Sequence, residues 1–324
     1  MSDETTEPAV LVEQRDRILI VTINRPKAKN AVNLAVSQGL ADAMDRLDGD
    51  PGLSVGIVTG AGGSFCAGMD LKAFARGERC DIDGRGLGFT QRPPAKPLIA
   101  AVEGYALAGG TEVALSCDLI VASRESAFGI PEVKRGLVAG GGGLLRLPQR
   151  IPYAIAMELA LTGENLSAER AHELGLVSAL TDAGGALDGA IALAEKIGAN
   201  GPLAVAATKK IVVESRYWGD EEQWTEQMKI LAPVFMSKDA QEGAVAFAEK
   251  RARSGPVPEP SRLPGADLFR RGCELVRVGA AGSAEQIDVG VGNVTLTPAG
   301  RPPSRARVPS ARPSRCARGD CART

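Results

Sequence analysis

The chain has 324 residues, 44% of them hydrophobic and 24% charged, and its formal net charge is −1. This composition is ordinary for a soluble globular protein, and the length allows a sizeable core. No apolar run reaches the roughly eighteen residues of a membrane helix, and the acidic start MSDETTEPAV lacks the basic and apolar parts of a signal peptide. We therefore expect no membrane partner and a cytoplasmic location.

The first half of the chain alternates apolar strand patterns with turns and helices. Residues 17–24, RILIVTIN, are a continuous β-branched run that predicts a buried strand. Asn33 is a plausible N-cap for an amphipathic helix that extends to about Asp48. Three further strands are predicted, at residues 55–59, 97–102 and 119–123.

Two glycine-rich turns follow predicted strands. One is GAGGSFCAGMDL at residues 60–71, and the other contains Gly109 and Gly110. A glycine pair between a strand and a helix lets the backbone turn sharply and leaves N–H groups unpaired. We expect the two turns to converge on one developing oxyanion, which stabilises acyl chemistry without a metal.

Two carboxylates accompany these turns. Glu112 falls in the first turn of a short helix, where the helix end favours an ionised carboxylate and suits a base. Glu132 follows the strand at residues 119–123. The glycines at 140–143 precede LLRLPQRI and predict another helix N-terminus near the site.

The remaining motifs exclude several chemistries. Neither G-x-x-x-x-G-K-[ST] nor a strand–G-x-G-x-x-G–helix pattern occurs, so nucleotide binding of those kinds loses support. His172 lies in a polar helical stretch and there is no G-x-S-x-G elbow, which argues against Ser-His-Asp catalysis. The six cysteines have no metal-like spacing, so we expect free thiols and no metal site: Cys66, Cys80, Cys117, Cys273, Cys316 and Cys321.

The C-terminal part divides into two segments. From Tyr153 to about residue 252 the pattern is helical, with more apolar stripes than one sheet edge can cover, which favours an oligomer interface. Residues 253–324 then contain twelve Arg, no Lys and nine of the twenty Pro. This composition predicts a disordered tail, and its all-Arg bias suggests the hypothesis of translation in an altered reading frame. It has one aromatic residue, so no base-stacking surface and no nucleic-acid partner are expected.

Three sequence motifs, in a fixed order, resemble those of a known protein family. G-x-x-F-x-A-G-x-D-L, A-x-x-G-x-A-x-A-G-G-x-E and F-G-x-P-E resemble the enoyl-CoA hydratase/isomerase (crotonase) family, from about residue 12 to residue 252. The resemblance implies an α/β fold, with a flexible N-terminus at 1–11 and a crotonase-like spiral of ββα units at 12–200. A helical trimerisation region would follow at 201–252, before the tail.

The resemblance also implies the site. The backbone N–H groups of Met69 and Gly109 would bind the thioester carbonyl, Glu112 would activate water, and Glu132 would protonate Cα. Residues implied to contact the CoA or acyl part are Lys27, Ala28, Ala67, Asp70, Leu71, Lys72 and Gly140. The resemblance places the loop of Lys27 and Lys29 against the CoA nucleotide, where both would suit its phosphates. The alternative is that these are two lysines in a solvated loop without a ligand.

Two segments bear on the acyl group. The glycine-rich segment after Lys72 corresponds to the family's variable loop over the acyl pocket and should form no regular element. Its glycines at 84, 86 and 88 either leave room for a bulky acyl group or mark a mobile loop. Leu144 and Leu145 stand where Thr and Gln are usual in the family, which changes the polarity of that wall.

The implied activity is hydration of trans-2-enoyl-CoA to 3-hydroxyacyl-CoA in β-oxidation, by a homotrimer or hexamer that uses no cofactor beyond the CoA of its substrate. The presence of both carboxylates favours a hydratase, because an isomerase of this family can shuttle its proton with one. Two alternatives stay open: an enoyl-CoA isomerase of the same fold, and a non-catalytic CoA-ester-binding scaffold subunit.

Overall fold

The computed structural model describes residues 7–252. The predicted disordered tail, and the cysteines in it, lie outside the described residues. The cysteines inside the described range are buried free thiols, as predicted: Cys66, Cys80 and Cys117.

A six-stranded sheet forms the centre of the fold, with the spatial order β1-β2-β3-β4-β6-β9. Its strands are β1 (Val10–Arg15), β2 (Ile18–Ile23), β3 (Val55–Gly60), β4 (Leu98–Val102), β6 (Leu119–Ser123) and β9 (Ala179–Thr181). β1 is antiparallel to β2, and all other neighbours are parallel. The four predicted strands are confirmed as β2, β3, β4 and β6.

β1 extends the sheet further toward the N-terminus than the sequence indicated. It begins at Val10, which pairs with Ile23, and the Asn24 N–H donates to the Ala9 carbonyl at 2.8 Å. The last residues of the segment expected to be flexible, 1–11, are therefore held by the edge of the sheet.

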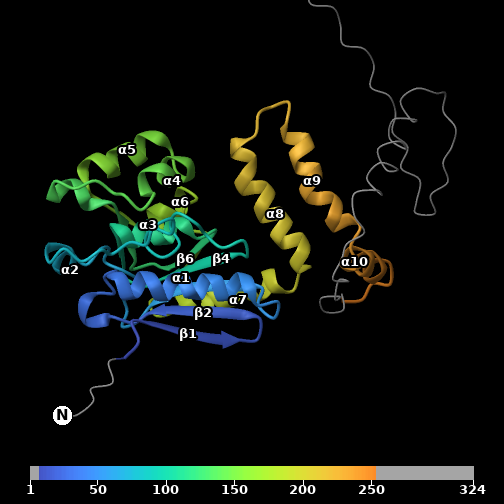
Figure 1. Cartoon of the computed structure of the whole chain (residues 1–324), viewed down its shortest axis with the longest axis horizontal. Helices are drawn as coiled ribbons and strands as arrows, with labels where there is room; N and C mark the ends of the chain where they lie inside the picture. Colours follow the sequence, from blue (N-terminus) through green and yellow to red (C-terminus); the bar gives the residue numbers. More distant parts are fainter. Residues whose placement is uncertain (1–6, 253–324) are drawn as a thin grey trace, which may run out of the picture. The chain divides into compact units, whose positions relative to one another are not determined.

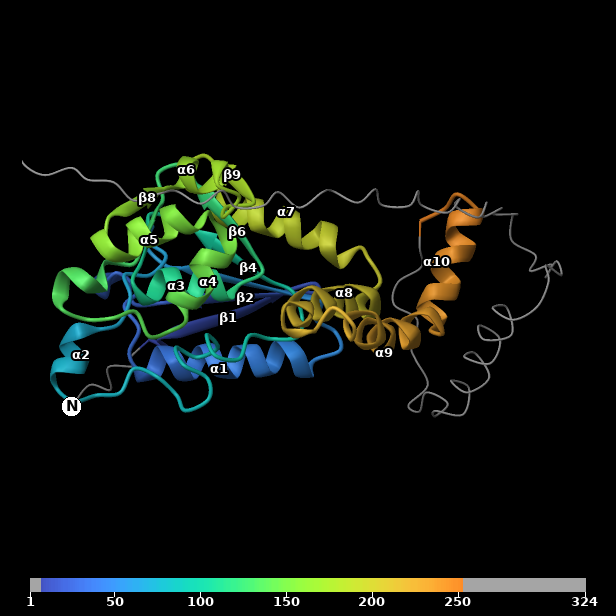
Figure 2. The same ribbon diagram turned by 90° about the horizontal axis from the view of Figure 1, so that it is seen from above.

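The continuous apolar run of β2 reflects burial on both faces. Successive side chains of a strand point to opposite sides, so a strand covered twice carries no polar alternation. Leu19, Val21 and Ile23 join the core cluster that includes α1 (Leu34–Gly49), whereas Ile18 and Ile20 pack with α7 (Ala186–Gly198). Figure 2 shows the sheet between these two helices. α1 begins after the predicted N-cap, because Asn33 Oδ1 accepts the Val36 N–H at 3.1 Å.

A smaller sheet contains β5 (Tyr105–Leu107), β7 (Ala127–Gly129) and β8 (Asn165–Ser167). β4, β5 and α3 (Gly109–Ser116) are consecutive and form one ββα unit of the predicted spiral; Figure 1 labels β4 and α3. All eight residues of α3 are buried. This burial holds the N-terminal end of α3, with Gly109 and Glu112, in a fixed position.

The other helical elements cover the sheets and form the C-terminal region. They are η1 (Pro26–Ala28), α2 (Leu71–Ala75), η2 (Pro131–Arg135), α4 (Gly143–Arg150), α5 (Tyr153–Thr162), α6 (Ala168–Glu173), α8 (Pro202–Glu214), η3 (Ser215–Tyr217), α9 (Gln223–Phe235) and α10 (Lys238–Ala248). Within residues 7–252, no helix combines the length and apolar character needed to cross a membrane. His172 on α6 is exposed, as predicted, and its Nδ1 lies 2.8 Å from the Val177 carbonyl oxygen.

The segment between α2 and β4 has no helix or strand, as predicted, but it is firmly packed. Leu87 and Phe89 are buried, and a Cβ on Gly88 would lie 2.6 Å from Leu40 Cβ of α1. A Cβ on Gly86 would lie 2.4 Å from Thr90 Oγ1, and both glycines have positive φ. Neither acyl room nor mobility accounts for these two glycines. They permit left-handed turns and a close approach to α1.

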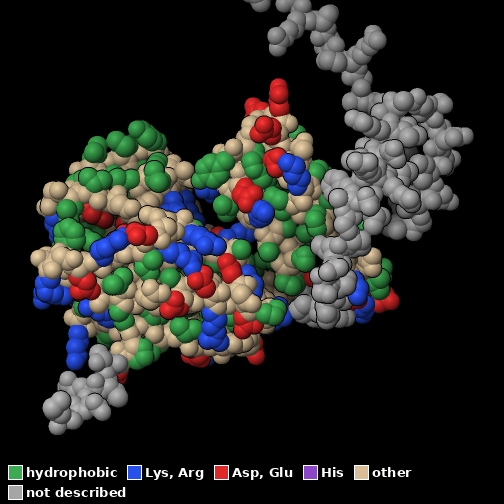
Figure 3. All heavy atoms as spheres, viewed as in Figure 1, with side chains coloured by type: hydrophobic (Ala, Val, Ile, Leu, Met, Phe, Trp, Pro, Cys, Tyr) green, Lys and Arg blue, Asp and Glu red, His purple; other side chains and the backbone are tan. Residues whose placement is uncertain are grey.

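The C-terminal helices carry many exposed apolar side chains. α8 and α9 lie side by side in Figure 1, and neither contains a buried residue. Apolar side chains also appear on the surface over α5 and α8 in Figure 3. The exposed large apolar residues of α8 to α10 are Val212, Val213, Tyr217, Trp224, Met228, Phe235, Met236, Val245 and Phe247.

Candidate active site

The two predicted oxyanion turns converge. A Cβ placed on Gly109 would lie 3.5 Å from the Met69 nitrogen, and one placed on Gly68 would lie 3.1 Å from the Gly109 nitrogen. Val32 fixes the first turn, because its N–H donates to the Gly68 carbonyl and its carbonyl accepts from the Asp70 N–H, each at 2.8 Å. Alternate residues of an extended chain direct their amides to opposite sides, so the Met69 N–H points away from Val32.

The second turn is fixed by an unusual backbone conformation. Ala108 has φ of +51°, and its N–H donates to the Gly129 carbonyl at 2.8 Å. A positive φ is unfavourable for alanine and persists only where the surroundings enforce it. Gly109 is the first residue of α3, where an N–H has no partner within the helix. Among residues 7–252, neither the Met69 nor the Gly109 N–H donates to a protein acceptor.

Glu112 is buried in a seat made of glycines. Its Oε1 accepts the Gly143 N–H at 2.9 Å, at the N-terminus of α4. A Cβ on Gly141 would lie 2.7 Å from Glu112 Oε2, and one on Gly143 would lie 3.0 Å from Glu112 Cγ. The glycine cluster therefore lets α4 and its preceding loop close around the carboxylate.

Burial is the strongest influence on the Glu112 carboxylate. It raises the pKa of Glu112, and the Gly143, Gly141 and Gly142 amides and the Arg146 charge only partly offset this effect. The backbone donors of a helix N-terminus lower this pKa and so favour the ionised form, but desolvation of the charge outweighs them. A carboxyl group with a raised pKa can exchange protons closer to neutral pH.

Glu132 lies on η2 and is half buried. Its Oε2 is buried and accepts no hydrogen bond from the described residues. Burial first, and then the charge of Glu112, raise the pKa of Glu132. The charge of Glu112 therefore favours the protonated form of Glu132. A buried carboxyl oxygen needs a polar partner, which water or a substrate can provide.

The loop of Lys27 is joined directly to the first oxyanion turn. Lys27 and Ala28 belong to η1, and the Ala67 N–H donates to the Lys29 carbonyl at 2.9 Å. The Lys27 and Lys29 side chains are exposed. This hydrogen bond brings the loop of the predicted CoA-contacting residues Lys27 and Ala28 to Ala67, two residues before Met69 in the chain.

Asp70 has protein partners for its carboxylate. It forms an ion pair with Arg25 at 2.9 Å and accepts the N–H groups of Lys72 and Ala73 as the N-cap of α2. These hydrogen bonds and the Arg25 charge lower the pKa of Asp70 despite its partial burial. The side chain holds α2 in place beside Met69, and Leu71 and Lys72 are exposed on α2.

The remaining predicted contact, Gly140, is exposed, and no atom lies within 4 Å of a Cβ placed on it. Sequence reasoning did not single out Leu87, whose Cδ1 would lie 2.8 Å from a Cβ on Gly109. No sequence signal marks this contact, because Leu87 belongs to an irregular segment. Leu87 supplies an apolar neighbour beside the oxyanion turns.

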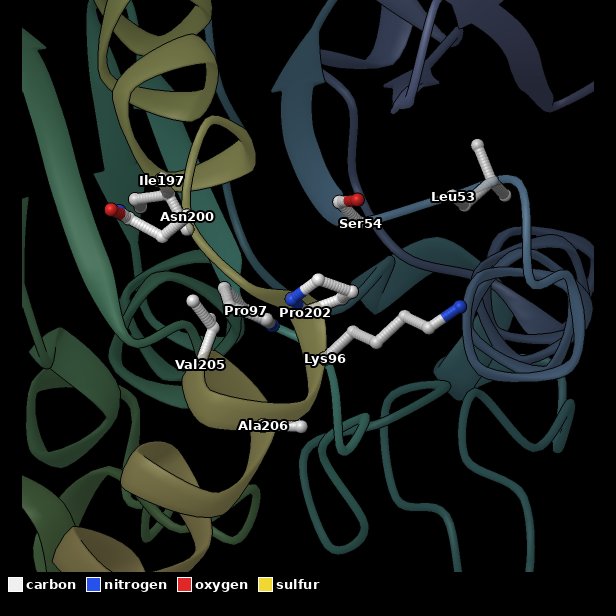
Figure 4. A pocket seen from close by; sticks show the side chains of 9 residues that line it. All are labelled: Leu53, Ser54, Lys96, Pro97, Ile197, Asn200, Pro202, Val205 and Ala206. Carbon is white, nitrogen blue, oxygen red and sulfur yellow. The ribbon is translucent and has the colours of Figure 1, made fainter. Parts of the chain in front are cut away.

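One hollow of the surface lies apart from these groups. Figure 4 shows it where α7 is followed by α8, and none of the predicted site residues lines it. Its Lys96 is committed to the end of α1, because Nζ donates to the Leu47 carbonyl at 2.8 Å and to the Asp50 carbonyl at 2.6 Å. This hollow is a packing gap between α8 and the core.

Two converging backbone amides, together with two carboxyl groups whose pKa values are raised, define a class of site that suits acyl-thioester chemistry. The chain belongs to the family described as enoyl-CoA hydratase/isomerase, which it matches over residues 13–254.

Individual relatives agree with this assignment. The crystal structure of enoyl-CoA hydratase EchA1 from Mycobacterium marinum is 78% identical, with a TM-score of 0.76, and the match covers 77% of this chain and 99% of that one. Enoyl-CoA hydratase EchA19 of Mycobacterium tuberculosis is 44% identical over 260 residues, 78% of this chain and 98% of its own. Carnitinyl-CoA dehydratase of Proteus mirabilis is 40% identical over 247 residues, 74% of this chain and 94% of its own. The predicted family, the crotonase fold and the hydratase class of enzyme are confirmed.

Proposed function

We propose that this chain adds water to trans-2-enoyl-CoA thioesters and forms 3-hydroxyacyl-CoA. The observation that carries the proposal is the pair of carboxyl groups with raised pKa values: Glu112, buried within one helical turn of the Gly109 amide, and Glu132, whose pKa the charge of Glu112 helps to raise. An isomerase needs one proton carrier, whereas a hydratase needs a base and an acid at the same time.

The Met69 and Gly109 N–H groups would donate to the thioester oxygen, which gains negative charge as the Cβ–O bond forms. Each such donor is typically worth about 10²- to 10³-fold in rate. The donors are backbone groups, so the turns that aim them matter more than the side chains at these positions. The proposed steps require no cofactor besides the CoA of the substrate.

In the proposed reaction Glu112 takes a proton from water as the water oxygen attacks Cβ. The electron pair of the Cα–Cβ double bond moves toward Cα and the carbonyl, and Glu132 delivers its proton to Cα. Glu112 ends protonated and Glu132 ionised, so one proton must pass between them before the next turnover. Their raised pKa values favour this exchange near neutral pH.

The acyl group is proposed to be apolar. Leu87 lies beside Gly109, and Leu144 and Leu145, at the start of α4, are 38% and 73% exposed. Apolar side chains at these points favour an alkyl chain over a polar or charged acyl group. Such substrates arise in fatty-acid β-oxidation, which we propose as the pathway, with the cytoplasm as its location.

The name of the Proteus mirabilis relative suggests a second candidate reaction, the dehydration of carnitinyl-CoA. Elimination of water is the reverse of the same step and would use the same groups. Its substrate carries a quaternary ammonium group, which the apolar neighbours named above do not favour.

A panel of substrates tests these proposals. Loss of the conjugated absorbance of crotonyl-CoA and longer 2-enoyl-CoA esters measures hydration, while its appearance from carnitinyl-CoA measures dehydration. We expect hydration, faster with the longer chains. A preference for 3-enoyl-CoA esters would establish the isomerase, and binding of CoA esters without turnover would establish the scaffold alternative.

We further propose that α8 to α10 join copies of the chain into a homotrimer or a hexamer. Support comes from their exposed apolar side chains, such as Trp224, Phe235 and Phe247, at 69%, 74% and 88% exposure. Light scattering coupled to size exclusion measures the assembly, and a monomer at micromolar concentration would overturn this proposal.

A further inference from the structure

Arg146 connects two loops that the chain builds far apart in sequence. Its guanidinium group extends from α4, where Nη2 donates to the Thr90 carbonyl at 2.5 Å and Nη1 donates to the Gly141 carbonyl at 3.4 Å. Thr90 belongs to the irregular segment between α2 and β4, and Gly141 belongs to the glycine loop before α4. The side chain is partly buried, and both contacts are hydrogen bonds from a charged donor.

The glycine loop is shaped to admit this side chain. Gly142 has φ of +100°, and a Cβ on it would lie 2.2 Å from Arg146 Nη1. A side chain at position 142 would force the guanidinium group to move and would also be strained in its backbone. The three glycines of the loop therefore have two uses: Gly141 and Gly143 make room for Glu112, and Gly142 makes room for Arg146.

Each of the two loops holds one part of the site. The glycine loop and the start of α4 seat Glu112, through the Gly143 N–H. In the other segment, Thr90 Oγ1 accepts the Leu87 N–H at 3.0 Å, and the Leu87 side chain lies against Gly109. The Thr90 residue that binds Arg146 thus also fixes the backbone of Leu87.

We propose that Arg146 is a positioning residue that couples the seat of the base Glu112 to the segment carrying Leu87 beside the oxyanion turn. This inference rests on the proposed hydratase function. One planar guanidinium group donates in two directions at once, whereas a lysine ammonium is a single point charge on a flexible stem. The coupling would keep the distance and orientation between the water-activating carboxylate and the thioester carbonyl constant during turnover.

Arg146 also acts on Glu112 through its charge. Its positive charge lowers the pKa of Glu112, against the larger effect of burial. Tyr217, Cys117 and Arg216 also act on Arg146 through their charges. Glu112 acts on Glu132, and Arg146 acts on Arg150. Removal of the Arg146 charge should therefore raise the pKa of the base further, and the acid limb of kcat/KM should move to higher pH.

The test compares Arg146→Met and Arg146→Lys with the matched control Arg150→Met. Arg150 lies one turn later on α4, is also partly buried and donates to the Cys117 and Asp118 carbonyls, so it contacts neither loop. We expect both Arg146 variants to lose about 10- to 100-fold in kcat with KM changed less than about threefold. Guanidinium ions should partly restore an Arg146→Ala variant.

A second readout does not require activity. Hydrogen exchange measured by mass spectrometry should accelerate in the peptides that contain Leu87 and Gly143 in both Arg146 variants, and in neither peptide of the Arg150 variant. If Arg146→Met does not fold, Arg146→Lys provides the same comparison. Faster exchange in one peptide alone, in neither, or equally in the Arg150 variant would overturn the coupling. A wild-type protein that fails to hydrate any enoyl-CoA refutes the proposed function, while the exchange experiment still decides the coupling.

Discussion

Glu112 and Gly143 are joined by a 2.9 Å hydrogen bond between a buried carboxylate and the first amide of α4. Helix N-termini commonly bind anions. Here the anion is supplied by the protein itself, from the neighbouring helix α3. The helix N-terminus that the glycines at 140–143 predicted near the site therefore binds Glu112, the proposed base.

Replacing either carboxylate should stop most of the turnover. Glu112→Gln and Glu132→Gln should each lower kcat by at least about 10²-fold with little change in KM, because each removes a proton carrier but retains a similar shape. Steady-state hydration of crotonyl-CoA measures the effect. Glu125→Gln, at an exposed position outside the site, is the control. Normal turnover by either site variant would contradict the two-glutamate mechanism.

The raised pKa of Glu112 has a consequence for stability. A group whose pKa is raised in the folded state binds more protons there, so the stability that it contributes is present at low pH and lost as the pH rises through the folded pKa. Glu112→Gln does not lose stability in this way. The difference in melting temperature, variant minus wild type, should therefore become more positive between about pH 4 and about pH 8. A difference that is constant over this range would show that burial does not control Glu112.

Adding one methyl group to the seat should disturb the base. The Cβ of Gly141→Ala would lie 2.7 Å from Glu112 Oε2 and 3.0 Å from its Cδ, so the carboxylate must move. We expect kcat to fall at least about tenfold, since displacement of a reacting group by about an ångström has a large effect on rate. Gly49→Ala, where no atom lies within 4 Å, is the matched control. Unchanged kinetics of Gly141→Ala would mean that the seat does not position the base.

The Arg-rich C-terminal segment should be dispensable. A chain that ends at Ala252 retains both carboxylates, both oxyanion turns and α1 to α10, so its core burial should be intact. It should fold, assemble and hydrate enoyl-CoA as the full chain does. Circular dichroism, light scattering and the hydration assay measure these properties. Dissociation or loss of activity on truncation would place a structural role in residues 253–324.

The elements of the core were predictable because their signals are local. The continuous β-branched run of β2 indicated a buried strand. A strand with one exposed face would instead alternate hydrophobic and polar residues. Asn33 indicated the start of α1 through its own side chain, and the glycines before Glu112 indicated a strand-to-helix turn. The three ordered motifs also identified the family, because their order and spacing are specific to it.

The relations that decide the chemistry join residues far apart in the chain. Glu112 meets Gly143 across 31 residues, and Arg146 meets Thr90 across 56. Local sequence carries no record of such partners. The pKa of Glu112 also depends on such distant partners. The sequence indicated the helix end that favours the ionised form, but not the burial that outweighs it. The amino-acid sequence determined which helices and strands form and which side chains can react. Packing of the sheets and helices alone decided which carboxylate is desolvated, which glycines make room for it and which apolar residue lies beside the oxyanion turn.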